Sequence, residues 1–410
     1  MPESLDKEIL KLVKNYCTPG VVSDLVRDLK RTELVEQQMT HRGKSRGKQR
    51  GRDLSSATSL DLLITRCQAT LSNEESLHVV LGIGDLFKRH GDLARAEEMF
   101  STAVGQGRRL AQKGAVAEAY MKRGEVHGRQ GHWKESMSDL SLSKQLFQEL
   151  QAHEAVGRVE NILGTNYAEQ GKLQQARQFF ERALSVFERT DQTLMTGTVL
   201  MNLGIVSNMM GEHDVALAHY KRAQSHFEAV GDLHRLGELH HNTGMSYLSK
   251  GRLTDARREF DEGLELGAAT GNVNLLGLAR LGKATVYFRQ SDAAMALKLV
   301  TQAIDALTVC NDRLSMADAY KLKGMIHRDI GTPDLAESYL QTSLRINLEL
   351  NNRLNAAETY FELGLLAKVR GQTAEAVQIL ERAAGLFKRV GAGADVRQIE
   401  EELVTLRKAQ

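Results

Sequence analysis

The sequence of 410 residues has little proline, cysteine or aromatic side chain. Of its three prolines, Pro2 and Pro19 lie in the first twenty residues, and Pro333 is the only one beyond them. Because proline breaks helix interiors, this scarcity favours an almost wholly helical chain. Aromatic residues make up 5% of the chain, so its helices are expected to pack through small and aliphatic side chains.

The three cysteines argue against two kinds of stabilising site. Cys17, Cys67 and Cys310 are far apart and form no Cys-x-x-Cys pair, which disfavours both a disulfide framework and a zinc site. The sequence also has no apolar run of 18 residues and no secretory signal at its start, so no membrane span is expected. These features predict a cytoplasmic protein without a cofactor.

Positive charge is concentrated in one short segment. Residues 41–52 contain six Lys/Arg and no acidic residue, whereas the rest of the chain has 48 basic residues against 52 acidic ones. The chain as a whole is therefore not basic, and no general nucleic-acid surface is expected. We interpret the segment as a solvated linker, with contact to nucleic acid, an anionic lipid surface or an acidic protein as the alternatives.

A repeat of 40 residues runs through most of the chain without insertion or deletion. A first glycine recurs at Gly84, Gly124, Gly164, Gly204, Gly244, Gly324 and Gly364, with Ala284 in the remaining place. A second glycine follows seven residues later in every unit but one, which has Ser291. Five residues further come Ala96, Ala176, Ala216, Ala256, Ala296, Ala336 and Ala376, with Ser136 as the exception. Four residues after these, every unit has a large apolar residue, such as Phe100 or Leu340.

Each of these positions has a structural interpretation. A glycine in a helix interior costs about 1 kcal/mol relative to alanine, which is tolerable where a neighbouring helix approaches its backbone closely. The alanine and the large apolar residue share one face of the next helix and pack against that glycine. The second glycine is interpreted as the left-handed residue that ends the first helix, and Thr332-Pro333 as the N-cap and first turn of the next one. Each unit is therefore predicted to be an antiparallel helical hairpin.

Segments such as 161–184 (NILGTNYAEQGKLQQARQFFERAL) and 361–384 (FELGLLAKVRGQTAEAVQILERAA) resemble the tetratricopeptide repeat, whose commonest form has about 34 residues. The longer unit is similar to the 40-residue repeats of Pins-type spindle-orientation adaptors, kinesin-light-chain-like proteins and bacterial peptide-sensing regulators of the Rap kind. The resemblance implies an all-α, right-handed solenoid of antiparallel helix pairs. In such a solenoid the first helices of the units line a concave groove that binds other polypeptides.

The repeats divide the chain into five parts. We expect a helical hairpin in residues 1–40, the basic linker in 41–52, a capping helix or decayed repeat in 53–76, eight repeats in 77–396 and a capping helix in 396–410. Solenoids need such caps because an end repeat would otherwise expose an apolar face. In the last part Ile399, Leu403 and Leu406 form the stripe that would face the eighth repeat.

The predicted groove residues follow from the repeat register. Positions of the first helix that should face the groove hold Lys122, Arg158, Asn161, Thr198, Met201, Asn202, Met209, His241, Asn242 and Met245. The amides of Asn161, Asn202 and Asn242 could hold an extended peptide backbone, because an amide both donates and accepts hydrogen bonds. Methionines would add adaptable apolar contacts. The alternative is that these asparagines bind neighbouring helices and stabilise the stack.

Other motifs are interpreted as parts of the repeat. Six of the thirteen histidines lie between His213 and His241, but no cysteine or carboxylate pattern completes a metal site, so packed or solvated histidines are expected. The glycines of residues 82–92 belong to the repeat and are not followed by Gly-Lys-Ser/Thr, which argues against a phosphate loop. We find no HExxH or Ser/His/Asp pattern outside the repeat, and we predict no enzyme.

Two functional hypotheses follow. The first is a non-enzymatic scaffold or adaptor that binds a peptide or helix of a partner protein in the groove. The alternative is a peptide-responsive signalling or transcriptional regulator, in which the repeats are the sensor and the N-terminal helices of residues 1–76 carry the output. A nucleic-acid partner is expected only through residues 41–52.

Overall fold

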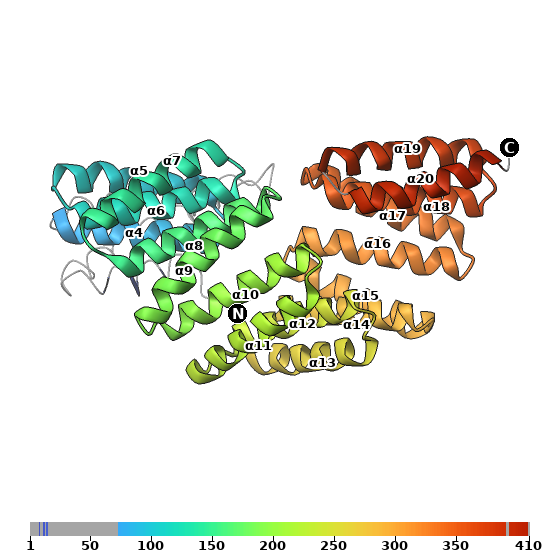
Figure 1. Cartoon of the computed structure of the whole chain (residues 1–410), viewed down its shortest axis with the longest axis horizontal. Helices are drawn as coiled ribbons and strands as arrows, with labels where there is room; N and C mark the ends of the chain where they lie inside the picture. The colour runs from blue at the N-terminus through green and yellow to red at the C-terminus, as the bar shows by residue number, and fades with distance from the viewer. Residues whose placement is uncertain (1–7, 9–10, 13, 15–72, 391–392, 409–410) are drawn as a thin grey trace, which may run out of the picture. The chain divides into compact units, whose positions relative to one another are not determined.

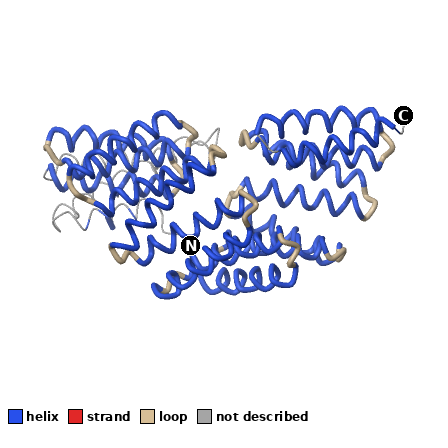
Figure 2. Tube along the Cα trace, in the orientation of Figure 1, coloured by secondary structure: helices blue, strands red, loops and turns tan. Residues whose placement is uncertain are grey.

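The computed structural model describes residues 73–390 and 393–408, together with Glu8, Lys11, Leu12 and Lys14. The chain divides into two compact units, residues 1–170 and 171–410. Apart from those four residues, the predicted N-terminal hairpin, the basic segment 41–52 and the region 53–72 lie outside the described residues. The described part consists of helices and turns and contains no strand (Figure 2).

Helices and short turns alternate regularly along the chain (Figure 1). The first unit contains α4 (Asn73–Arg89), α5 (Leu93–Arg109), α6 (Lys113–Arg129), α7 (Trp133–Glu149) and α8 (His153–Glu169). The second contains α9 (Leu173–Arg189), α10 (Thr193–Met209), α11 (His213–Val230), α12 (Leu233–Ser249), α13 (Leu253–Thr270), α14 (Val273–Arg289), α15 (Ala293–Val309), α16 (Arg313–Asp329), α17 (Pro333–Glu349), α18 (Arg353–Val369), α19 (Thr373–Val390) and α20 (Gly393–Lys408). We call the even-numbered helices α4 to α18 the A helices and the odd-numbered helices α5 to α19 the B helices. Within each unit, every helix packs against the next one along the chain, so the fold is an all-α solenoid of helical hairpins.

A left-handed residue ends each A helix, as predicted. The seven turn glycines, from Gly91 to Gly371, have φ between +71° and +81°, and Ser291 has φ +61° in the eighth turn. At Gly91 the turn is closed by two backbone bonds, because the amides of Gly91 and Asp92 donate to the carbonyls of Lys88 and Phe87. This pattern satisfies carbonyl groups that a helix end leaves without a partner.

In six of the hairpins, the first glycine faces the large apolar residue that lies 16 positions later, in the B helix of the same hairpin. A Cβ atom built at Gly84, Gly124, Gly204, Gly244, Gly324 or Gly364 would lie within 2.8 Å of Phe100, Leu140, Tyr220, Phe260, Leu340 or Leu380, respectively. The missing Cβ therefore lets the two helices approach closely, which confirms the role predicted for these glycines. Ala176, Ala216 and Ala256, the small residues beside this contact, are fully buried.

The unit that lacks this glycine has a smaller partner. Ala284 occupies the glycine position, and the residue 16 positions later is Val300 instead of a leucine or an aromatic residue. Both side chains are fully buried in the same core cluster. The volume added by one methyl group in α14 is thus offset by a smaller side chain in α15.

The turn between α16 and α17 differs in one detail from the prediction. Thr332 is the N-cap residue of α17 and Pro333 is its first residue, but the threonine hydroxyl does not cap the helix. It donates instead to the carbonyl of His327 (3.0 Å) and lies 2.8 Å from Nδ1 of that histidine. The hydroxyl therefore ties the turn to the preceding A helix.

Both ends of the array are covered by further residues. Leu12 packs against Gly82 and the core of the first hairpin, and Glu8 pairs with Arg89 and His90 at the end of α4. At the other end, Ile399, Leu403 and Leu406 of α20 are buried against the last hairpin. Each of these contacts removes an apolar face from water at a point where the repeat has no further neighbour.

Candidate partner-binding surface

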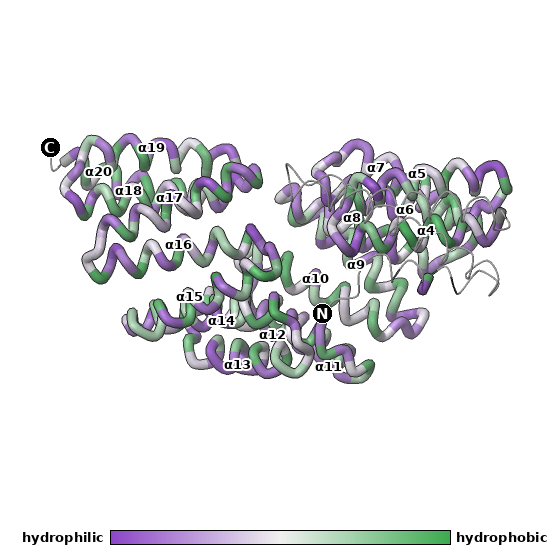
Figure 3. The backbone as a smooth tube through the Cα atoms, turned by 180° about the vertical axis from the view of Figure 1, so that it is seen from behind, coloured by the Kyte–Doolittle hydropathy of each residue, from purple (hydrophilic) through white to green (hydrophobic). Residues whose placement is uncertain are grey.

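The A helices of each unit lie next to one another and form what we call the A-helix face. In the first unit α4 contacts α6 and α6 contacts α8, and in the second unit contacts run from α10 through α12, α14 and α16 to α18. Residues at equivalent positions of consecutive A helices are therefore neighbours across this face. The side chains on this face differ from one A helix to the next, and Figure 3 colours each residue of these helices by its hydropathy.

In the first unit, ion pairs between hairpins occupy the A-helix face. Lys122 of α6 pairs with Asp85 of α4 and lies 3.3 Å from Glu118. Nearby, Lys88 Nζ lies 2.6 Å from Glu125. Burial alone would lower the pKa of Lys122, but the two carboxylates outweigh it and the pKa is raised, so the ammonium stays charged. Lys122, a predicted groove residue, thus holds two hairpins together.

The other predicted groove residues of the first unit lie on α8. Arg158 is exposed, so its guanidinium is accessible to a partner. Asn161 is half-buried and already has an interaction partner. Of the two, the arginine is the accessible side chain.

Helix α10 differs from its neighbours because it contains no charged residue. Two of its predicted groove residues are buried: Thr198 donates its hydroxyl to the carbonyl of Leu194 (2.9 Å), and Met201 lies in the core with Tyr220. The third, Asn202, is half-buried and has an interaction partner. Met209, at the end of the helix, is 54% exposed.

The next A helix, α12, presents a similar surface. Met245 is 40% exposed. Asn242, at the position equivalent to Asn202, is half-buried, and its amide makes no hydrogen bond to any described residue. These side chains and Met209 of α10 are all uncharged, and they offer one free amide and two flexible apolar contacts on adjacent A helices. We call Met209, Asn242 and Met245 the methionine–amide surface.

His241 lies beside this surface and is enclosed on one side. Its ring packs against Phe260, with the ring centres 5.9 Å apart, and its Nδ1 atom is buried without a hydrogen-bond partner. Burial lowers the pKa of His241 to about 4, so the imidazole is neutral at physiological pH. The ring therefore contributes an uncharged, mainly apolar wall.

Charge returns at the C-terminal end of the A-helix face. Lys321 of α16 pairs with Glu358 of α18 and lies 3.4 Å from Asp318, while Arg328 pairs with Glu362. Burial raises the pKa of both Asp318 and Glu362. As in the first unit, the charges are already paired across adjacent hairpins.

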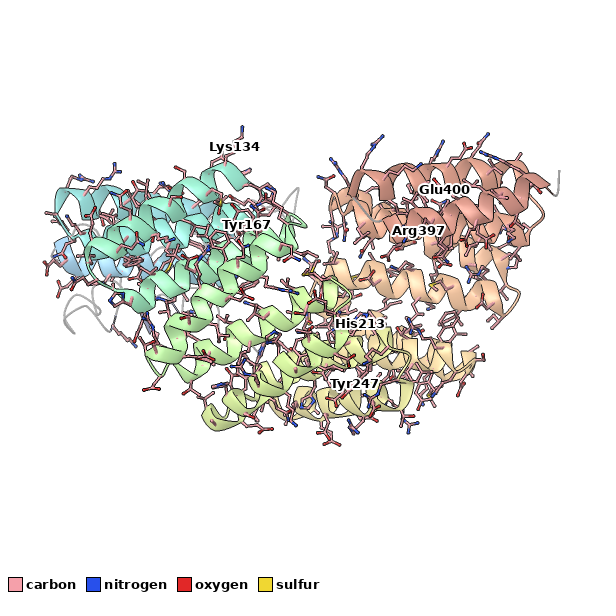
Figure 4. All side chains as sticks on the ribbon, in the orientation of Figure 1. Lys134, Tyr167, His213, Tyr247, Arg397 and Glu400 are labelled. Atoms are coloured by element: carbon pink, nitrogen blue, oxygen red, sulfur yellow. The ribbon has the colours of Figure 1, made fainter. Side chains whose placement is uncertain are left out.

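The concentration of histidines does not form a metal site within the described residues. His213 Nδ1 lies 2.8 Å from the side-chain oxygen of Asn208, where α10 ends and α11 begins (Figure 4). His240 Nδ1 lies 2.9 Å from Glu259, and His234 is exposed beside Glu238. No group of three His, Cys, Asp or Glu side chains in residues 73–390 and 393–408 is placed to hold a metal ion. None of the described helices is both long and apolar enough to cross a membrane.

The repeat identified above places the chain among known proteins. The sequence profile of the tetratricopeptide repeat matches residues 115–189, 155–229, 195–269 and 315–389. The chain belongs to the tetratricopeptide repeat family. Beyond this match, its sequence is not significantly similar to any curated protein.

Several solved tetratricopeptide structures have a similar fold. The apo form of the quorum sensor NprR from B. thuringiensis is 15% identical, with a TM-score of 0.59 over 90% of this chain and 98% of that one. Aspartyl phosphate phosphatase F from Bacillus subtilis is 14% identical, with a TM-score of 0.59 over 85% of this chain and 94% of that one. A Rap protein solved with Competence and Sporulation Factor is 12% identical, with a TM-score of 0.55 over 82% of this chain and 99% of that one. At this level of identity the likeness concerns the fold.

Proposed function

We propose that the protein is a non-enzymatic interaction scaffold that binds a peptide segment of a partner protein on the A-helix face of α10 and α12. The observation that carries the proposal is the methionine–amide surface, whose two methionines are exposed and whose residues carry no charge. In the same unit, Lys321 and Arg328 of α16 already pair with Glu358 and Glu362 of α18. A peptide reaching the surface would meet flexible apolar side chains and the free amide of Asn242, without having to break an ion pair.

This assignment also fits the character of a tetratricopeptide array. A solenoid buries its core between repeats and leaves a long face available for extended ligands. Among the structures of similar fold, the Rap protein was solved together with Competence and Sporulation Factor, and NprR is a quorum sensor. This likeness supports a peptide as the class of partner, and Asn202 of α10 is proposed as a further contact of it.

The test is to place negative charge on the surface. In Met209→Glu/Met245→Glu, the set of proteins captured from a cell extract should lose its main members, which mass spectrometry would identify. The matched control, Val309→Glu/Leu335→Glu, adds the same charge at apolar residues that are exposed on B helices. If both variants capture the same proteins as the wild type, the assignment to α10 and α12 is wrong.

A second candidate function is a peptide-responsive regulator whose N-terminal region carries the output. It is favoured by the contact of Glu8 and Leu12 with α4, which couples this region to the first repeat. Deleting residues 1–72 separates the two functions. A scaffold would still bind its partner peptide and act in cells, whereas a regulator would bind the peptide but lose its cellular effect.

A further inference from the structure

A groove lies between α17 and α19, the B helices of the last two hairpins. It has a volume of about 590 Å³ and is lined by Leu348 of α17, Tyr360 of α18 and the residues Gln378, Glu381, Arg382, Gly385, Leu386 and Arg389 of α19. Its floor is Tyr360, since α18 packs against both α17 and α19. A volume of this size lies within the range of ordinary ligand sites.

Gly385 keeps the groove open. A Cβ atom built at this glycine would meet no atom within 4 Å, so the glycine is not needed for packing between helices. In this it differs from Gly364 of the same hairpin, which faces Leu380 closely. Glycine in a helix interior is unfavourable by about 1 kcal/mol relative to alanine. Because no close contact between helices requires glycine at position 385, its structural effect is to leave the groove open.

The charges around the groove do not cancel. Arg382 and Arg389 are exposed and make no ion pair or side-chain hydrogen bond with any described residue. The nearby carboxylates are already paired: Glu381 lies 2.8 Å from Arg407, and Glu349, next to Leu348, pairs with Arg313 and Arg345. The groove therefore presents two free guanidinium groups and no free carboxylate.

The combination of these residues belongs to one hairpin. Of the eight hairpins, only the eighth has arginines at the positions of Arg382 and Arg389 together with glycine at the position of Gly385. The third hairpin has arginines at both positions, Arg182 and Arg189, but it has Ser185 at the position of Gly385. The groove is thus a feature of this hairpin and not a consequence of the repeat.

We propose that this groove binds an acidic peptide segment of a partner protein, whose carboxylates pair with Arg382 and Arg389 and whose apolar side chain packs on Leu348, Tyr360 and Leu386. Arginine suits this role because its planar guanidinium pairs with a carboxylate through two parallel hydrogen bonds. Leu348, which is 54% exposed, becomes buried in the complex.

The spacing of the arginines defines the ligand further. Seven residues separate them along α19, which corresponds to about 10 Å. In a peptide of polyproline II conformation this distance matches acidic residues three positions apart, because each residue advances the chain by about 3.1 Å and three residues complete a turn, which places both carboxylates on the same side. The preferred segment is therefore extended, with Asp or Glu at both ends of a four-residue stretch and a leucine or similar residue between them.

Fluorescence anisotropy with the labelled peptide Gly-Glu-Leu-Ser-Glu-Gly tests the proposal on the full chain. The wild type should bind it, and the affinity should fall as salt is added, because exposed charges are screened. Arg382→Gln/Arg389→Gln should weaken binding about tenfold or more. The control Arg257→Gln/Arg353→Gln removes the same charge from exposed arginines outside the groove and should bind as the wild type does.

A second variant separates loss of the groove from loss of the fold. Gly385→Leu fills the open space without changing charge, and it should abolish binding while leaving the chain at least as stable, because glycine is the poorer helix former. Met209→Glu/Met245→Glu changes the surface of the proposed function and leaves the groove intact, so this variant should bind the acidic peptide normally. The test of the groove therefore does not depend on whether the proposed function is correct.

Four outcomes would overturn the assignment. One is no binding of the acidic peptide up to about 1 mM, which corresponds to negligible affinity. Another is equal binding of Gly-Lys-Leu-Ser-Lys-Gly, or binding that neither groove variant weakens. The last is a dimer in sedimentation experiments that Gly385→Leu disrupts, which would assign the groove to a second copy of the chain.

Discussion

Ala111 occupies a backbone conformation that alanine rarely adopts. Its φ is +54°, in the connection between α5 and α6, where Gly231 and Gly271 occupy the equivalent position of later hairpins. A left-handed conformation costs a residue with a Cβ atom roughly 1–2 kcal/mol, and glycine avoids this cost. Glycine also makes the unfolded chain more flexible, which cancels part of the gain in stability. Ala111→Gly should therefore stabilise the chain by about 0.5–1 kcal/mol, seen as a higher urea midpoint in circular dichroism.

The reverse substitution is its control. Gly231→Ala places a Cβ atom at φ +68° and should destabilise the chain by about 1 kcal/mol. A lower urea midpoint for Ala111→Gly would show that the helix connection does not store this strain.

His241 makes stability depend on pH in a defined window. The unfolded chain takes up a proton at this residue near pH 6.5, whereas burial lowers the pKa in the folded chain to about 4. The folded state thus binds fewer protons between these values, and its free energy of unfolding falls by up to about 1.4 kcal/mol per pH unit as pH is lowered. His241→Gln should remove this component of the pH dependence, measured by urea unfolding between pH 7 and pH 4.

The exposed His234 on the same helix is the matched control. His234→Gln should leave the pH dependence of the wild type nearly unchanged. If His241→Gln keeps the full slope between about pH 6.5 and pH 4, the imidazole titrates normally in the folded chain.

At the scale of helices, the contact between the first glycine and its large partner can be exchanged for another solution already present in the chain. Gly324 faces Leu340, and a Cβ atom would lie 2.6 Å from the leucine Cγ. Ala284 with Val300 shows that a larger residue in the A helix is accommodated by a smaller one in the B helix. Gly324→Ala alone should therefore destabilise the hairpin by about 1–3 kcal/mol, since a packed core resists added volume.

The double variant Gly324→Ala/Leu340→Val should recover part of that loss. A double-mutant cycle from thermal or urea unfolding would give a favourable coupling energy of about 0.5 kcal/mol or more. Strictly additive effects would mean that the helices separate to admit the methyl group, and that the pairing is not a constraint.

The repeats were predictable from the sequence because each helix junction and helix contact has a local chemical signature. Turn glycines such as Gly91 and the pairing of Gly84 with Phe100 follow from backbone freedom and side-chain size. The left-handed conformations of Ala111 and Gln151 could not be predicted in this way, since nothing in those residue types requires them. Their only signal is the alignment with Gly231 in the repeat.

The binding surface was less predictable. The register places Thr198 and Met201 on an A helix, but it does not say how deeply neighbouring side chains bury them. The pair of Lys122 with Asp85 spans 37 residues, and it could have been found by comparing charges on consecutive A helices. The groove at Gly385 depends on the shape left between three helices, which residue types alone do not define.

At the scale of the whole molecule, the constant 40-residue period makes the hairpin a removable module. Deleting residues 233–272 removes α12 and α13 and joins α11 to α14 through an equivalent connection. Because stability in a solenoid is approximately a sum over repeats and their nearest-neighbour interfaces, the shortened chain should fold and lose helical signal in proportion. Circular dichroism and a thermal melt would check this.

The control for this prediction is the deletion of half a hairpin. Removing residues 253–272 leaves two A helices in succession and should disrupt folding of the second unit. If the whole-hairpin deletion unfolds as completely as this one, the repeats are not independent modules.

The pairing of each first glycine with a residue 16 positions later has a consequence for the history of the sequence. Both partners lie in one hairpin, so a change at one can be compensated by a change at the other without involving adjacent units. Ala284 with Val300 has the form that such a compensated exchange would leave. Among related arrays, the two positions should therefore vary together, and covariation at a separation of 16 residues should mark each hairpin as a unit of descent.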